Sequence, residues 1–264
     1  LLVAADWAVG SWSEMMYYKS KYGIFCKQIH SLQESNEDIL ILGSSRAVHH
    51  YIPKIFEDSL KMTCYNAGSE GMCIYYHYVV LASCIERKYY PRIVVYDAYY
   101  RDIEISNKPE FTLDAALDRL LPHYGNVHFV DSLFDLRRDF SENVKLLSKT
   151  YRYNSKLVQT IKCNYIPWSE NKGFEALNGT MSEDYKVGDV LKEVNEHNLE
   201  DRKLTFLQKL ITMCKENDIK LVICYSPFYN AKRSTSIDII NEMAKSNGIP
   251  FLDYSQDEKF QKLE

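Results

Sequence analysis

Short apolar runs alternate with amphipathic stretches along most of the chain, and each run ends at a glycine or at polar residues. The runs at 38–43, 91–97 and 219–225 are the clearest, and weaker runs fall at 61–65 and 250–254. Apolar runs of this length are typical of strands that are buried on both faces of a parallel sheet. The pattern therefore predicts five strands, most of them parallel.

Stretches with helical spacing of apolar residues lie between these runs. Strands that alternate with helices predict right-handed crossovers between parallel strands. We therefore expect the α/β class, with a flavodoxin-like three-layer fold, a mostly parallel sheet and an inserted helical cap region. The expected helices cover residues 10–34, 53–60, 71–88, 112–121, 126–150, 199–217 and 235–247.

The alternation of strands and helices is interrupted at about 100–200, where helical stretches lead into a loop-like part at 163–190. We interpret this region as an insertion that forms a cap or lid. It belongs to a single α/β domain that spans residues 38–264. Residues 1–37 are expected to be a helical lead-in to that domain.

The two ends of the chain suggest a longer protein. Residues 1–9 are apolar but fewer than the ~20 residues that a membrane span needs. We expect them to be the end of a membrane anchor that begins upstream of residue 1. The alternative is an amphipathic first helix that packs on the domain. The polar segment after the last strand, up to Glu264, is expected to continue.

Composition narrows the classes of function. The formal net charge is −4 and the basic residues are scattered, so nucleic-acid binding is not expected. The 21 tyrosines fit a carbohydrate or polar-lipid surface, or simply a tyrosine-rich core and rim. The seven cysteines include no C-x-x-C pair, and no phosphate-binding glycine loop or metal-ligand spacing occurs. We therefore expect no metal and no cofactor.

Polar residues follow the first strand directly. Gly43 ends the apolar run, and Ser44, Ser45 and Arg46 come next. In open α/β sheets, chemistry is located beyond the carboxyl ends of the strands. These three residues therefore occupy the place of a nucleophile, although a capping turn from strand to helix would use the same residue types.

Three short motifs, each after an expected strand, resemble the blocks of the SGNH (GDSL-like) hydrolase superfamily. Gly43-Ser44-Ser45 is similar to the Gly-Asp-Ser block, and Asn66-Ala67-Gly68 is similar to the block that contributes to the oxyanion hole. Tyr96-Asp97-Ala98-Tyr99 stands where many members carry Gly-x-Asn-Asp. More narrowly, the chain resembles the membrane-anchored, extracytoplasmic branch that includes D-alanine-transfer and polysaccharide O-acetylation proteins.

The resemblance implies a role for each matching position. Ser45 would be the nucleophile, and the backbone amide of Gly68 would help to hold the oxyanion. The asparagine that usually donates a side-chain hydrogen bond is absent from the third motif. The expected substrate-binding residues are Ser44, Arg46, Asn66 and Asp97.

A serine hydroxyl needs a general base. The resemblance implies an Asp-x-x-His pair after the last strand, but no histidine follows His197, so we expect this pair beyond Glu264. None of the histidines within the chain is assigned as the base; those considered are His49, His50, His77, His123, His128 and His197.

We carry three hypotheses. The first is an SGNH-like serine esterase or acyltransferase that acts on acyl esters of cell-envelope glycans, or on a small ester. The second is a non-catalytic protein of the same fold that binds a glycan or an envelope partner. The third is a flavodoxin-like binding domain unrelated to hydrolases, whose loop after the first strand binds an anion. The first hypothesis implies an extracytoplasmic, membrane-anchored protein; otherwise we expect a cytoplasmic one.

Overall fold

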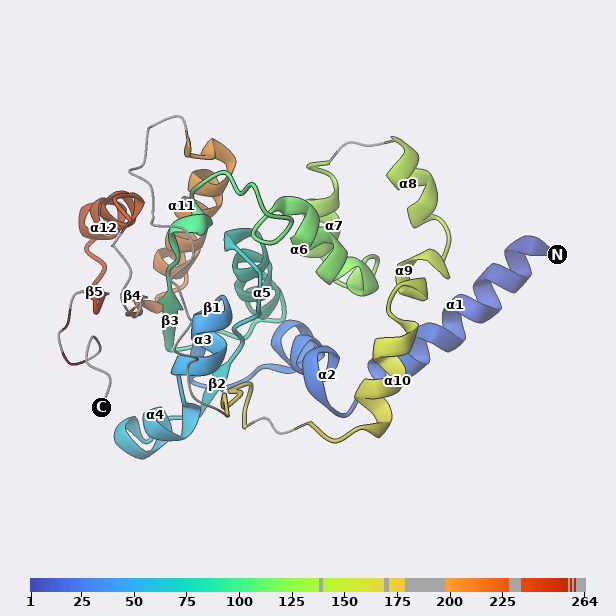
Figure 1. The fold of residues 1–264 in the computed structure, drawn as a ribbon, viewed down its shortest axis with the longest axis horizontal. Helices are drawn as coiled ribbons and strands as arrows, with labels where there is room; N and C mark the ends of the chain where they lie inside the picture. The colour runs from blue at the N-terminus through green and yellow to red at the C-terminus, as the bar shows by residue number, and fades with distance from the viewer. Residues whose placement is uncertain are drawn as a thin grey trace, which may run out of the picture.

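The fold is built on a five-stranded parallel sheet. The computed structural model describes residues 1–137, 140–168, 171–178, 198–227, 234–255, 257 and 259. Within these residues the strand order is β2-β1-β3-β4-β5, and every neighbouring pair is parallel (Figure 1). The strands are β1 (Ile39–Gly43), β2 (Cys64–Asn66), β3 (Ile93–Asp97), β4 (Lys220–Tyr225) and β5 (Phe251–Asp253). The expected α/β class and the five strands are confirmed.

Most of the expected helices are also found. The α-helices of the described residues are α1 (Leu2–Tyr18), α2 (Gly23–Ile29), α3 (Ser45–His50), α4 (Pro53–Leu60), α5 (Ile74–Glu86), α6 (Leu113–Leu120), α7 (His128–Phe134), α8 (Phe140–Leu146), α9 (Tyr151–Asn154), α10 (Leu157–Tyr165), α11 (Asp201–Glu216) and α12 (Ser236–Ser246), of which α3, α9 and α10 were not expected. A π-helical turn, His30–Glu34, extends α2.

The middle of the chain differs from the expectation in detail. The helical stretch expected near 126–150 contains two helices, α7 and α8. The part expected to be loop-like at 163–190 begins inside α10, and its residues 169–170 and 179–190 lie outside the described residues. The buried residues of α10 are Thr160 and Cys163, and neither is strongly apolar. The helical period was therefore hard to see in the sequence.

Alternate residues of β1 face two different layers of helices. Leu40 and Leu42 belong to the large core that includes buried residues of α5, α11 and α12. Ile39 and Ile41 point to the opposite face, where they join a smaller cluster with Ala47 of α3. This alternation follows from the two-residue period of a strand. It accounts for the uninterrupted apolar run, because both faces of β1 are covered.

A separate group of helices lies beside the sheet. Figure 1 shows α1 extending outward with α10 alongside it, and α1 contacts α2, α9 and α10. Tyr17, Phe25, Ile29, Tyr153 and Cys163 form the buried cluster of this group. In this cluster, residues from the start of the chain pack against residues from the region at 100–200 that was expected to form a cap. The division of the chain into a lead-in and a capped domain stays a prediction.

The attachment of α1 to the segment before α9 is close. The carboxylate of Asp6 accepts hydrogen bonds from the Ser148 hydroxyl at 2.6 Å and from the Lys149 backbone N–H at 2.9 Å. A Cβ at Gly10 would lie only 2.7 Å from the carbonyl carbon of Lys149. A glycine is therefore required where α1 crosses this segment.

The exposed surface of α1 is largely apolar. Its exposed large apolar side chains are Leu2, Val3, Trp7, Val9, Trp12 and Met15, and the exposed Leu1 precedes them. Among the residues that the structure describes, no helix combines the length and the apolar character that crossing a bilayer requires.

Candidate functional site

The candidate site lies at the carboxyl edge of the sheet, where the strand order reverses. The chain leaves β1 toward β2 on one side and returns to β3 on the other. In this strand order, ligands bind outside the carboxyl ends of β1 and β3. Gly43 and Asp97, the last residues of these two strands, are directly paired in the sheet. All three sequence motifs therefore converge on one edge.

Ser45 occupies the expected position of a nucleophile. It is the first residue of α3, directly after the buried Ser44, and its side chain is partly exposed. Gly43 makes this turn possible, since its φ is +144° and a Cβ there would lie 2.8 Å from the Asp97 backbone oxygen. Within the described residues the Ser45 hydroxyl has no hydrogen-bond partner. It is therefore free to meet a ligand.

Arg46 and Asp97 form a buried ion pair behind Ser45. Arg46 Nε lies 3.4 Å from Asp97 Oδ2, and both side chains are nearly inaccessible to solvent. Arg46 also donates to the backbone oxygens of Ala98 and Ser226. Its guanidinium lies 4.8 Å from the ring centres of both Tyr99 and Tyr225. A planar cation with five donors suits such an aromatic and carbonyl-lined space.

The second carboxylate oxygen of Asp97 is also fully engaged. Oδ1 accepts hydrogen bonds from the Ser226 hydroxyl at 2.6 Å, from the Ser226 backbone N–H at 3.1 Å and from the Tyr51 hydroxyl at 3.1 Å. Burial and the nearby Asp97 carboxylate raise the pKa of Tyr51. Asp97 thus joins β3 to the end of β4 and to the residue after α3. Its expected role in substrate binding stays a prediction beside this observed structural role.

Asn66 holds the backbone at the end of β2. Its side-chain amide donates to the backbone oxygens of Ala47 at 2.6 Å and Tyr51 at 2.9 Å. Its side-chain oxygen accepts a hydrogen bond from the Gly68 N–H at 3.0 Å. This N–H is the one expected to contribute to an oxyanion hole. To donate to an oxyanion, the Gly68 N–H would have to break its hydrogen bond to the Asn66 side chain.

No histidine reaches Ser45 within the described residues. His49 lies one turn further along α3, but its Nδ1 is 2.7 Å from the Glu175 backbone oxygen and its Nε2 is 2.9 Å from Glu70 Oε1. Each ring nitrogen of His49 therefore already has an oxygen partner other than Ser45. Partial burial lowers the pKa of His50, while the Asp97 carboxylate opposes this shift.

The other histidines lie elsewhere. His77 and His123 are fully buried in the helical layers, where burial lowers the pKa of each to about 3. His128 begins α7 and is exposed, and His197 lies outside the described residues. The expectation that none of them supplies the base is compatible with these positions.

The two cysteines in the strands nearest the candidate site are poor nucleophiles in this structure. Burial raises the pKa of Cys224, the one nearest the candidate site in β4, to about 11. It raises the pKa of Cys64 in β2 to about 12. A thiolate is the reactive form, so these thiols are inert near neutral pH. They fill space as small apolar side chains.

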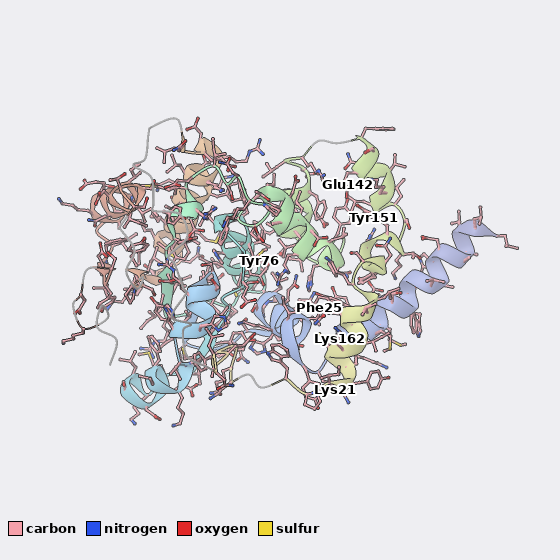
Figure 2. The ribbon with its side chains drawn as sticks, viewed as in Figure 1. Lys21, Phe25, Tyr76, Glu142, Tyr151 and Lys162 are labelled. Carbon is pink, nitrogen blue, oxygen red and sulfur yellow. The ribbon has the colours of Figure 1, made fainter. Side chains whose placement is uncertain are left out.

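A cavity of about 460 Å³ opens beyond the carboxyl end of β2. Gly68 and Ser69 line it from the end of that strand, and Val48 lines it from α3. Phe25 of α2 and Tyr76 of α5 lie on its walls (Figure 2). Ser45 is not part of the lining, although Val48 follows it by one helical turn. Sequence reasoning missed this cavity, because α2, α5, α6 and α10 meet there only in the folded chain.

The segment 171–178 packs against the end of β2 and against α3, beside the candidate site. The Asn66 backbone N–H donates to Lys172 O at 2.9 Å, and the Glu175 N–H donates to Val48 O at 3.1 Å. Gly173 lies between them with φ +81°, and a Cβ there would fall 1.9 Å from the Asn66 backbone oxygen. The buried Lys27 donates to the Gly173 carbonyl. Only the glycine gave a local signal for this contact in the sequence.

Within the described residues, no group of three or more histidine, cysteine, aspartate or glutamate side chains is arranged to hold a metal ion. Comparison of the chain with protein-family models, with curated proteins and with solved structures found no match. The resemblance to SGNH hydrolases therefore stays a hypothesis.

Proposed function

We propose that the protein is an SGNH-like serine esterase or acyltransferase that acts on acyl esters of cell-envelope glycans, with Ser45 as its nucleophile. The observation that carries this proposal is the position of Ser45. It begins a helix directly after the interior strand β1, at the point where the strand order reverses, and its hydroxyl is partly exposed and unbonded within the described residues.

The proposed reaction follows from this position. The Ser45 oxygen attacks the ester carbonyl carbon, its proton passes to a general base, and the alcohol leaves with a proton. Water or a second hydroxyl then accepts the acyl group from Ser45. The backbone N–H groups of the first turn of a helix have no partner within the helix, so that of Ser45 can donate to the oxyanion. The proposal requires a base in addition to the groups that the structure describes at Ser45.

A serine-reactive fluorophosphonate probe tests the proposal. We expect the wild-type protein to be labelled, with the modified residue identified as Ser45 by peptide mass spectrometry, and Ser45→Ala to remain unlabelled. Ser246→Ala, which removes an exposed serine at the end of α12, is the matched control and should be labelled normally. An unlabelled wild type, or a Ser45→Ala variant labelled as strongly as wild type, would overturn the proposal.

One observation favours the second hypothesis, a protein that binds a glycan without cleaving it. The Gly68 N–H is bonded to Asn66, and His49 has no free ring nitrogen. A site that lacks a base and one of its two expected oxyanion donors is better suited to binding than to reaction. A probe-inert protein that still binds saccharide would support this reading.

A further inference from the structure

We infer that the cavity beyond β2 is a binding site for a neutral oligosaccharide, and that Trp168 forms the platform of this site. The choice of ligand class rests on the proposed function. The location of the site and the chemistry of its walls come from the structure. The argument has three steps: the shape of the cavity, the charges on its walls and the position of Trp168.

Two adjoining hollows make up the site, which we call the groove. The cavity of about 460 Å³ is followed by a second hollow of about 350 Å³, and the two share Gly23, Gln159 and Trp168. Each volume lies within the range of small-molecule sites, about 300–1,000 Å³. Two adjoining hollows of this size suit a chain of several rings better than a single compact ligand.

The walls are charged but electrically balanced. Three cationic side chains, Lys27, Arg119 and Lys156, face three anionic ones, Glu70, Asp118 and Glu175. These charges already have partners. Lys156 pairs with Asp118 at 2.6 Å, and Lys27 lies 3.9 Å from Glu175.

The remaining charged groups are engaged as well. Glu70 pairs with His49 at 2.9 Å, and Arg119 donates to Ser69 Oγ and to the Glu70 backbone oxygen, both at 3.4 Å. An anionic ligand at Lys27 or Lys156 would have to break an ion pair and leave a carboxylate uncompensated. A neutral ligand that is rich in hydroxyls can add hydrogen bonds to the same groups without breaking them.

Trp168 provides an apolar surface between the two hollows. Its side chain is 56% exposed, and a Cβ at Gly23 would lie 4.0 Å from Cγ of the indole. Sugar rings present a face of C–H groups and an edge of hydroxyls, so they match a flat aromatic ring flanked by polar side chains. Gln159, which lines both hollows, supplies amide groups at the edge of the ring.

The site adjoins the proposed nucleophile through two residues. Gly68 and Val48 line the cavity, and they belong to the motif after β2 and to the helix that begins at Ser45. A glycan held in the groove would therefore present its ester toward the carboxyl edge of β1. This arrangement assigns the groove to the carbohydrate and Ser45 to the acyl group.

The test is a titration with two neutral probes, cellotetraose and tetra-N-acetylchitotetraose, followed by tryptophan fluorescence and saturation-transfer NMR. We expect saturable binding of at least one probe with a dissociation constant of about 1 mM or lower. Trp168→Ala should weaken binding at least about tenfold. Gln159→Ala should weaken it less. Both positions are exposed, so neither change should unfold the protein.

The control is Trp12→Ala, which removes another exposed tryptophan, 51% accessible, from α1 and away from the groove. It should leave the affinity unchanged. The inference would be overturned if neither probe binds, if Trp168→Ala binds as tightly as wild type, or if inorganic phosphate competes with the saccharide. Competition by phosphate would indicate an anion site.

The saccharide titration and the fluorophosphonate assay, read together, separate this inference from the proposed function. Saccharide binding by a protein that the fluorophosphonate probe does not label upholds the groove and overturns the esterase. Labelling of Ser45 without saccharide binding upholds the esterase and overturns the groove.

Discussion

Arg46 and Asp97 lie 3.4 Å apart, Nε to Oδ2, in a space from which solvent is almost excluded. The pair connects the helix after β1 to the end of β3. Through the hydrogen bonds of both residues to Ser226 it also reaches the end of β4. Three neighbouring segments of the carboxyl edge thus depend on one buried ion pair.

Removal of the carboxylate should be costly. Asp97→Ala leaves the buried Arg46 cation without its counter-charge, so we expect the free energy of unfolding in urea to fall by about 3–5 kcal/mol. Asp58→Ala is the control, because it also breaks an ion pair, with Lys54, but both partners are exposed. It should change stability little. Similar losses in the two variants would contradict the structural role of Asp97.

Gly173 and Gly248 both have positive φ, but only Gly173 has close neighbours, so alanine at the two positions should destabilise the protein to different extents. Gly173→Ala places a Cβ 1.9 Å from the Asn66 backbone oxygen, whereas nothing lies within 4 Å of a Cβ at Gly248. Gly248→Ala should therefore cost only the backbone strain, about 1–2 kcal/mol. Gly173→Ala should cost more, because a backbone atom cannot rotate away. Equal midpoints of urea unfolding would show that the segment 171–178 is not held against β2.

Asp102 should make the protein less stable as the pH rises. Burial raises the pKa of its carboxyl from 3.8 to about 6, so the folded state binds more protons than the unfolded state between these values. Asp102→Asn removes this titration. Its stability relative to wild type should increase by up to about 3 kcal/mol between about pH 4 and pH 7.

The control for this comparison is Asp218→Asn, which makes the same change at an exposed position. Its stability relative to wild type should be much less sensitive to pH. Urea unfolding at each pH measures the differences. A constant difference between Asp102→Asn and wild type would refute the raised pKa.

His77 should act in the opposite direction. Burial lowers its pKa from 6.5 to about 3, so the unfolded state binds more protons and wild-type stability falls as the pH drops below 6.5. His77→Leu should gain about 1.4 kcal/mol relative to wild type for each pH unit below this value. The exposed His128→Leu serves as the control. The prediction fails if acid affects His77→Leu and wild type equally.

The sequence predicted the sheet well, because its strands leave a local signature. Both faces of β1 are covered, so Ile39–Gly43 contains no polar side chain, and its end marks the place of Ser45. Pro53 likewise indicated the start of α4. Such features depend only on residues that are near one another in the chain.

The partners in the candidate site could not be predicted in the same way. Arg46 lies between Tyr99 and Tyr225, which are 53 and 179 positions away. Asn66 engages the Gly68 N–H through a side-chain geometry that has no periodic signature. The groove at Trp168 combines helices that become neighbours only after folding. The residue types alone indicated a possible nucleophile and oxyanion donor. Contacts between residues far apart in the sequence determine which of these groups already have hydrogen-bond partners.

The attachment of Asp6 and Gly10 to the segment at 148–150 has a consequence for synthesis on the ribosome. The contact partners of α1 emerge about 130 residues after the helix itself, roughly 7–26 s later at 5–20 residues per second. Throughout this interval Tyr17, buried in the finished protein, has no covering partner from α9 or α10. A nascent-chain chaperone would therefore meet α1 as an uncovered, largely apolar segment until the ribosome has passed α10.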